Sequence, residues 1–168
     1  NGMGIGYMFN IESAFPYGLL VDPADGERIV DELANRKVRA DAILDTGHPC
    51  ISLCDSRAAG RTPELELMLA QGIVRKFDSL SELANAHDIP ASRLEKTVND
   101  YNAAVDQSRD PAFDKPIPGD AKPVDTPPYY AMRTWPKVHH TMGGVCIDDQ
   151  ARVIGAGMSP IARLFAAG

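Results

Sequence analysis

The sequence predicts an α+β fold, a small sheet with three helices, and three observations lead to it. Short apolar runs bounded by turn residues have the length and flanks of β-strands. Apolar residues at helical spacing mark longer segments in the middle of the chain. The 168 residues, 44% of them apolar and 24% charged, are enough for one domain with a core and part of a second.

The first part of the chain predicts short strands separated by turns, and one short helix. The pair Asp25 and Gly26 supplies turn chemistry between the first two strands. Gly47 is expected to end the helix. In chain order these elements are strands over 17–22 and 28–31, a helix over 38–44 and a strand over 51–53.

Three longer helices are predicted next, each from a different signal. Thr62 before a proline has the composition of a helix start, and Gly72 ends that helix. Ser79 and Glu82 form a capping-box pattern, in which the hydroxyl accepts an amide N–H and the carboxylate reaches back. The strongest helix spans 91–105, where four apolar side chains form one stripe. They are Leu94, Val98, Tyr101 and Val105.

The last third of the chain is predicted to be irregular at first and then rich in strands. Six prolines among Asp and Lys residues make 108–128 a long irregular connection on the surface. Strands are predicted over 129–135, 144–148, 151–154 and 164–168. Because a buried strand normally leads to a turn and a further element, we expect the chain to be a truncated piece of a longer protein.

Composition excludes several classes of function. A net charge of −6 without any run of Lys or Arg argues against a nucleic-acid partner. The apolar stretches are far shorter than the roughly 20 residues of a membrane-spanning helix. Three cysteines, an odd number, argue against a disulfide framework and favour a reducing compartment, so we expect a cytoplasmic protein.

The cysteines do not predict a metal site either. Cys50 and Cys54 are separated by three residues and no second cysteine pair exists, which is poor spacing for a structural zinc site. Buried small hydrophobic side chains are the better interpretation of these two residues and of Cys146. We therefore expect no bound metal.

The segment 138–144, Val-His-His-Thr-Met-Gly-Gly, carries the clearest chemical signal. Adjacent histidines on an extended backbone point to opposite faces, so His139 can contact a ligand while His140 faces another group. Gly143 and Gly144 let the backbone approach a flat cofactor closely. A bare His-His pair is more often part of an ordinary polar loop, and the residues that follow it favour a site here.

This segment resembles the active-site segment of the flavoprotein fumarate reductases and their succinate dehydrogenase relatives. The likeness continues in order along nearly the whole chain. It includes 18–32 at the entry to the family's capping domain, a Thr-Val-Asn-Asp-Tyr-Asn helix at 97–102, Pro-Tyr-Tyr-Ala at 128–131 and the final strand at 160–168. The resemblance implies an FAD-dependent oxidoreductase that reduces or dehydrogenates a carbon–carbon bond next to a carboxylate.

The resemblance also implies a division into domains. Residues 14–132 correspond to the substrate-capping domain, 1–13 to the edge of the FAD-binding domain, and 133–168 to a truncated return into that domain. Gly6 is followed by Tyr-Met-Phe where the family's FAD fingerprint continues to a third glycine, so this stretch is interpreted as a loop. We therefore expect FAD in the full-length parent, and an inactive fragment without it.

Two residues are predicted to carry the chemistry because they match the family's positions. Arg36 aligns with the arginine that delivers a proton to the substrate while reduced flavin delivers hydride. Glu12 aligns with the glutamate that relays protons to it. An arginine, whose ordinary pKa is above about 12, acts as an acid only with such a relay. Taken alone, Arg36 would be interpreted as a solvated arginine beside a helix.

The remaining predicted roles concern binding. His139 aligns with the residue that holds the far carboxylate of the substrate, and Arg36 and Glu12 are expected to contact the substrate as well. His140 aligns with a residue beside the flavin ring. The predicted cofactor-facing residues are His140, Thr141, Met142, Gly143, Gly144, Ala167 and Gly168.

Two positions depart from the fumarate reductase pattern. Phe15 stands where the reductases carry a second arginine, and Ile11 replaces a threonine. Both changes remove polar groups from a site for dicarboxylates, so the substrate can differ from fumarate, or the reaction can run as a dehydrogenation. Two alternatives stay open: a non-catalytic binding module that keeps the capping fold, and a ketosteroid dehydrogenase-like relative, which would use tyrosines in place of Arg36 and His139.

Overall fold

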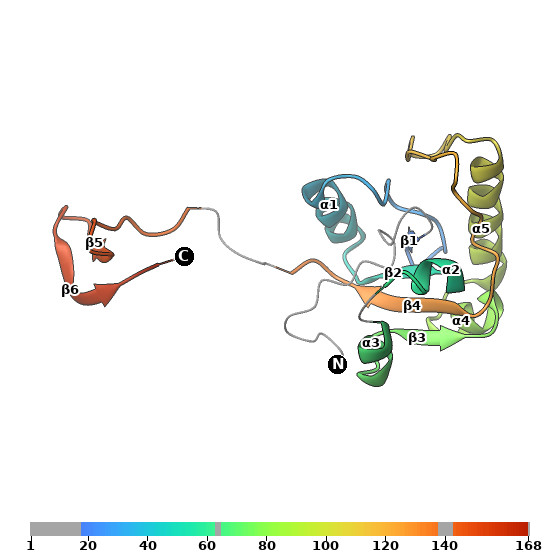
Figure 1. Ribbon diagram of the computed structural model, residues 1–168, viewed down its shortest axis with the longest axis horizontal. Coiled ribbons are helices and arrows are strands. Elements are labelled where there is room, and N and C mark those ends of the chain that lie inside the picture. The colour runs from blue at the N-terminus through green and yellow to red at the C-terminus, as the bar shows by residue number, and fades with distance from the viewer. Residues whose placement is uncertain (1–17, 63–64, 138–142, 168) are drawn as a thin grey trace. The chain divides into compact units, whose positions relative to one another are not determined.

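A computed structural model describes residues 18–62, 65–137 and 143–167 of the chain (Figure 1). The contacts divide the chain into two compact units, Asn1–Pro136 and Lys137–Gly168. Each unit has its own antiparallel sheet. The domain boundaries implied by the family resemblance are a separate matter and stay a prediction.

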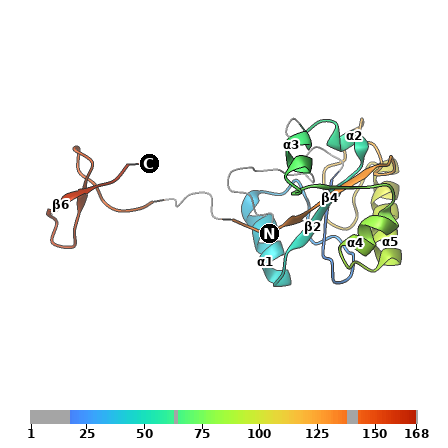
Figure 2. The same ribbon diagram turned by 90° about the horizontal axis from the view of Figure 1, so that it is seen from below.

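The first unit is a four-stranded antiparallel sheet with helices packed around it, which confirms the predicted α+β class. The strand order is β1-β2-β4-β3. The strands are β1 (Leu19–Val21), β2 (Cys50–Cys54), β3 (Arg75–Phe77) and β4 (Tyr129–Thr134). The helices are α1 (Arg36–Thr46), α2 (Ser56–Ala59), α3 (Leu65–Ala70), α4 (Leu80–Ala86) and α5 (Ala91–Asp106). In both views α1 and α5 lie at opposite ends of this unit, with the sheet between them (Figures 1 and 2).

The core of this unit lies on both faces of the sheet. Strand β1 shows why, because its alternating side chains enter two different apolar clusters. Leu19 and Val21 pack in the larger cluster with the buried stripe of α5. Leu20 packs in a smaller cluster with Ile43 of α1 and Cys50 of β2. Helix α1 is therefore held by the smaller cluster, on the face of the sheet that the larger one leaves uncovered.

The predicted helix signals are confirmed in the described residues. Gly47 ends α1 with φ 75°, a conformation that glycine adopts without strain. The Ser79 hydroxyl accepts the Glu82 N–H at 3.1 Å, and the Glu82 carboxylate accepts the Asp78 N–H at 2.8 Å. The stripe on α5 is buried as expected. The proline of the predicted start after Thr62 lies outside the described residues.

Several predictions about the first unit need correction. The strand expected at 28–31 is reduced to one bridge between Val21 and Arg28, and the side chains of Arg28 and Glu32 are buried in an ion pair. Short elements α2 and β3 were not predicted, since four residues and an Arg-Lys-Phe triplet carry no periodicity. The connection 108–128 is irregular as predicted but is not confined to the surface. Asp110, Lys115 and Val124 within it are buried.

The second unit is a two-stranded sheet of β5 (Arg152–Ile154) and β6 (Pro160–Phe165). The segments expected as strands at 144–148 and 151–154 do pair around a turn, although only β5 is long enough to form a strand. Ile147 and Val153 form one bridge, the Asp148 N–H donates to the Arg152 carbonyl at 3.1 Å, and the Ile154 N–H donates to the Cys146 carbonyl at 2.8 Å. Of the strand expected at 164–168, residues 164–165 form the end of β6, residues 166–167 are not in a strand, and Gly168 lies outside the described residues. Cys146 is exposed here, whereas Cys50 and Cys54 are buried as predicted. The reason is that most of this small sheet is exposed.

None of the helices in the described ranges is both long and apolar enough to cross a bilayer. Within the same ranges, no group of three or more His, Cys, Asp or Glu side chains is placed to hold a metal ion.

His87 gives the fold a pH dependence that can be measured. It ends α4 and lies edge-to-face on Phe77, with ring centroids 5.7 Å apart. Burial, together with Arg75 and Arg133, holds the pKa of His87 below its ordinary value. The unfolded chain therefore binds this proton more readily, so stability is expected to fall as the pH drops below about 6.5 and to level off below the folded-state pKa.

The measurement is the free energy of urea unfolding between pH 7.5 and pH 5, for the wild type and His87→Leu. The variant is expected to lose less stability over this range, because its side chain takes up no proton. Equal pH dependence in the two proteins would contradict the assignment.

Candidate active site

Arg36 is the first residue of α1, and its side chain is exposed. Asn35 precedes it as the N-cap, with its side-chain oxygen accepting the Val38 N–H at 3.1 Å. The first turn of α1 carries no acidic residue. A guanidinium at the start of a helix adds its charge to the positive end of the helix dipole, a combination that favours a carboxylate ligand.

The loop before α1 is fixed by its own hydrogen bonds and by packing. The Asp31 carboxylate accepts the Leu33 N–H at 2.8 Å, and the Ala34 N–H donates to the Asp31 carbonyl at 3.0 Å. Val30 is buried in the smaller apolar cluster, and Ala34 packs against it. The loop thus enters α1 along one defined path.

Four charged side chains are buried next to one another where this loop meets the proline-rich connection 108–128. They are Arg28, Glu32, Asp110 and Lys115, here called the buried charge cluster. Arg28 pairs with Glu32 through two contacts, Nε to Oε1 at 2.9 Å and Nη2 to Oε2 at 2.7 Å. Arg28 Nη1 lies 2.8 Å from Asp110 Oδ2, as an ion pair without hydrogen-bond alignment. Lys115 Nζ lies 3.0 Å from Glu32 Oε2. The side chains are between 0% and 6% exposed, so water screens these contacts little.

The cluster is neutral overall, which makes its burial tolerable. Burial alone would raise the pKa of Glu32, but Lys115, Arg28 and the Leu20 N–H together hold that pKa below its ordinary value. Glu32 is therefore ionised at neutral pH. Aromatic rings supply the rest of the environment, because the Arg28 guanidinium lies 5.1 Å from the centre of the Tyr101 ring and 5.0 Å from that of Phe113.

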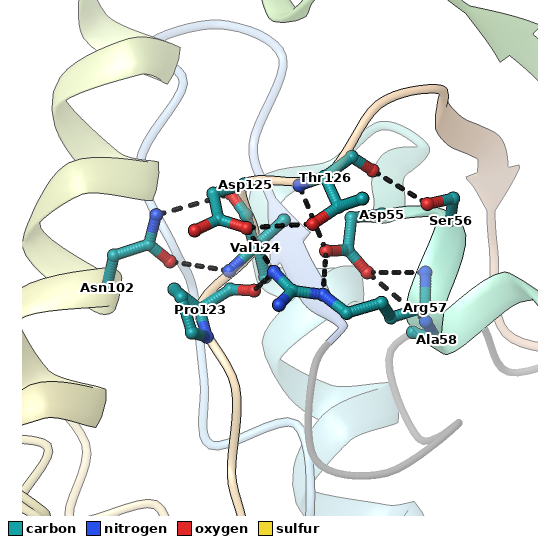
Figure 3. Close-up of polar contacts among 9 residues, drawn as sticks. All are labelled: Asp55, Ser56, Arg57, Ala58, Asn102, Pro123, Val124, Asp125 and Thr126. Atoms are coloured by element: carbon teal, nitrogen blue, oxygen red, sulfur yellow. Dashed lines mark hydrogen bonds and ion pairs between the residues drawn. The ribbon is translucent and has the colours of Figure 1, made fainter.

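A second polar network ties α2 to the end of the connection 108–128, here called the proline-rich segment (Figure 3). The buried Asp55 carboxylate accepts N–H groups from the first turn of α2 and, at 3.2 Å, the Thr126 N–H. Arg57 Nε donates to it at 3.0 Å. Asn102 of α5 exchanges two hydrogen bonds with the backbone of Val124. Since both Asp55 oxygens are occupied by the protein, we interpret this network as structural.

The second unit holds the described part of the predicted flavin-facing segment. Gly143 and Gly144 have φ of 109° and 125°, and a Cβ built on either would meet nothing within 4 Å. The space is open, but a side chain would strain the backbone at both positions. An exposed backbone of this kind fits a segment that lies against a flat cofactor, so these residues are compatible with FAD. Ala167 is exposed as well.

The other predicted site residues cannot be placed in the same way. They lie outside the described residues, and they are Glu12, His139, His140, Thr141, Met142 and Gly168. Of the predicted catalytic pair, the structure therefore describes Arg36 alone.

A cavity of about 560 Å³ opens beside α5 in the first unit. Arg28, Tyr101 and Phe113 are among its lining residues, and none of the predicted site residues is. Charged groups on its rim pair with one another, as Arg93 does with Glu27 at 3.3 Å. We therefore do not take this cavity as the active site.

Sequence reasoning missed the buried charge cluster. The spacing of Arg28 and Glu32 is common in exposed pairs, and composition alone assigned Lys115 to a surface connection. One signal was present in the sequence: Glu32 lies four residues before Arg36, and Arg28 lies four residues before Glu32.

Known proteins with similar sequences show the family to which this chain belongs. The sequence of residues 7–168 matches a family described as FAD binding domain. The chain belongs to the FAD binding domain family. FAD is thus confirmed as the cofactor of the family, and the predicted resemblance to fumarate reductase flavoproteins is confirmed by the relatives below.

Two curated relatives are similar over most of the chain. The NADH:acrylate oxidoreductase of Vibrio harveyi is 39% identical over 163 residues, which cover 90% of this chain and 16% of that protein. The fumarate reductase (cytochrome) of Shewanella frigidimarina is 32% identical over 153 residues, 90% of this chain and 26% of that protein. The chain thus spans about a sixth to a quarter of the length of these relatives.

Two solved structures are also similar to this chain. The open conformation of a flavocytochrome c3 fumarate reductase superposes with a TM-score of 0.83 at 31% identity, covering 96% of this chain and 28% of that one. A 3-ketosteroid delta1-dehydrogenase from Sterolibacterium denitrificans superposes with a TM-score of 0.67 at 23% identity, over 93% of this chain and 33% of that one. The second likeness bears on the fold alone.

The cap on α1 can be tested by its effect on the first turn that carries Arg36. Asn35→Ala removes the acceptor for the Val38 N–H and is expected to cost about 1 kcal/mol of stability. Hydrogen exchange of the first-turn amides of α1 should become faster.

Ser79→Ala is the matched control, since it removes the same kind of cap from α4. It should cost a similar amount while leaving exchange in α1 unchanged. Equal exchange of α1 in both variants would show that the Asn35 cap does not hold this turn.

Proposed function

We propose that the chain is part of an FAD-dependent oxidoreductase that reduces, or in the reverse direction dehydrogenates, a carbon–carbon bond next to a carboxylate. The observation that carries this proposal is the position of Arg36, exposed at the capped start of α1. Membership in the FAD binding domain family supports it, as do relatives named as an NADH:acrylate oxidoreductase and a fumarate reductase.

In this proposal Arg36 is the proton-transferring group. FAD, when bound, supplies the hydride chemistry at its N5 atom. Arg36 gives a proton to the substrate carbon next to the carboxylate, so the double bond gains one hydride and one proton and becomes saturated. Glu12 then returns a proton to Arg36. The guanidinium charge also stabilises the negative charge that develops on the substrate during transfer.

The remaining roles are proposed on the match with the family. His139 would bind the substrate carboxylate, and the segment from His140 to Gly144, with Ala167 and Gly168, would face the flavin. Residues 14–132 would form the substrate-capping domain, with 1–13 and 133–168 belonging to the FAD-binding domain. A cap of this kind excludes water from the site when it closes.

For the substrate we propose a monocarboxylic 2-enoate in preference to a dicarboxylate. Ile11 and Phe15 stand where the fumarate reductases carry a threonine and a second arginine, so two polar groups for a dicarboxylate site are absent from the sequence. The relative named as an acrylate oxidoreductase has the higher identity of the two relatives compared above, 39% against 32%. A single carboxylate needs fewer polar partners.

The role of Arg36 is tested in the full-length holoprotein. Arg36→Ala is expected to lower kcat by about 100-fold or more, because general acid catalysis contributes about 10²- to 10⁴-fold. The FAD content should stay unchanged, since the removed group is assigned to the substrate. The measurement is steady-state reduction of acrylate per bound flavin.

Lys37→Ala provides the control, because Lys37 is the next residue of α1, is exposed and pairs with Asp41 along the helix. This variant should keep kcat within about twofold of the wild type, since surface ion pairs contribute little. Full activity in Arg36→Ala would remove the basis of the assignment.

A further inference from the structure

We infer that Glu32 and Lys115 position Arg36 for proton transfer, by joining the loop before α1 to the proline-rich segment. The inference rests on the proposed function of Arg36 and adds to it the residues that set the position of Arg36. Neither Glu32 nor Lys115 is assigned to touch the substrate, so both are positioning residues.

A short connection joins the buried charge cluster to Arg36. Only residues 33–35 separate Glu32 from Arg36. These residues have little freedom, because the Leu33 and Ala34 N–H groups are both bonded to Asp31 and Asn35 caps the helix. A displacement of Glu32 is therefore transmitted to the first turn of α1.

Glu32 is held by contacts from three different parts of the first unit. Its Oε1 accepts the Leu20 N–H of β1 at 3.1 Å and the Arg28 Nε at 2.9 Å. Its Oε2 contacts Arg28 Nη2 at 2.7 Å and Lys115 Nζ at 3.0 Å. The carboxylate is fully buried and is fixed from a strand, from its own loop and from the proline-rich segment.

Lys115 supplies the long-range part of this arrangement. Its Nζ donates to the Gly18 carbonyl at 2.9 Å and lies 4.7 Å from the centre of the Tyr101 ring of α5. The side chain is 0% exposed. Through Lys115 the position of Glu32 depends on the start of β1, on α5 and on the fold of the proline-rich segment.

A buried charge cluster is better suited to fixing a geometry than to adding stability. Buried ion pairs are often replaceable by apolar residues without loss of stability, so they are weak devices for stability alone. Their directional contacts can instead select one arrangement of a loop. Catalysis is sensitive to this, because a displacement of about 1 Å can lower a rate by about 100-fold.

The test uses two variants of the full-length holoprotein, Glu32→Gln and Lys115→Met. Glutamine keeps an acceptor for the Leu20 N–H but removes the charge, and Lys115→Met leaves the pair of Arg28 with Glu32 intact. Both are expected to lower kcat for acrylate per bound flavin by about tenfold or more, from a shift below 1 Å. The solvent deuterium isotope effect on kcat should rise, because proton transfer becomes slower than the other steps.

Asp55→Asn is the matched control. Asp55 is an equally buried carboxylate in the network of Figure 3, which does not include the loop before α1. It is expected to lower the melting temperature as the other variants do, while kcat per flavin and the isotope effect stay at wild-type values. If Glu32 had a purely structural role, Glu32→Gln would also lower the melting temperature while kcat per flavin and the isotope effect stayed at wild-type values. That result would overturn the inference.

A readout independent of turnover separates this inference from the proposed function. Hydrogen exchange of residues 33–39 should become faster in Glu32→Gln and Lys115→Met and stay unchanged in Asp55→Asn. If Glu32→Gln fails to fold, Lys115→Met decides the outcome, and unchanged exchange in that variant overturns the inference. A wild-type holoprotein that reduces no 2-enoate would overturn the proposed function, while the exchange data would still decide whether the cluster holds the loop.

Discussion

The Glu32 carboxylate, paired with Arg28, joins β1, the loop before α1 and the proline-rich segment at one buried point. The described chain after β1 forms one bridge, Val21 to Arg28, and the side chains of Arg28 and Glu32 are buried there. The pair also requires Lys115 and Asp110 beside it, because the two carboxylates and two cations must balance within the apolar interior. The proline-rich segment is therefore held in the core by these charges as well as by apolar contacts of Ile117 and Val124.

Two buried carboxylates hold the proline-rich segment near its two ends. Glu32 holds it at Lys115, and Asp55 holds it at Thr126, immediately before the chain enters β4. A segment with little regular structure thus acquires a defined path between α5 and the sheet. Through the contact of Lys115 with Glu32, the same segment reaches the loop that leads into α1 and to Arg36.

The sequence predicted the parts of this fold that depend on local patterns. The α5 stripe, the Ser79 cap and the Gly47 stop follow from periodicity and backbone preference, and all three are found. The burial of Lys115 could not be predicted this way, since it depends on partners far away in the chain. The role of Arg36 is a prediction that rests on its match to a family, because the local pattern does not distinguish a catalytic arginine at a helix start from a solvated one.

The central claim is that this chain contributes Arg36 to the reduction of a 2-enoate by a flavoprotein. The most direct measurement is a single turnover of the full-length holoprotein without oxygen. Its FAD is first reduced chemically, and acrylate or fumarate is then added while the flavin absorbance is recorded. The account predicts that acrylate restores the oxidised spectrum, with one propionate formed per flavin, and does so faster than fumarate. A reduced spectrum that persists with both acids, or a protein that contains no flavin, would contradict it.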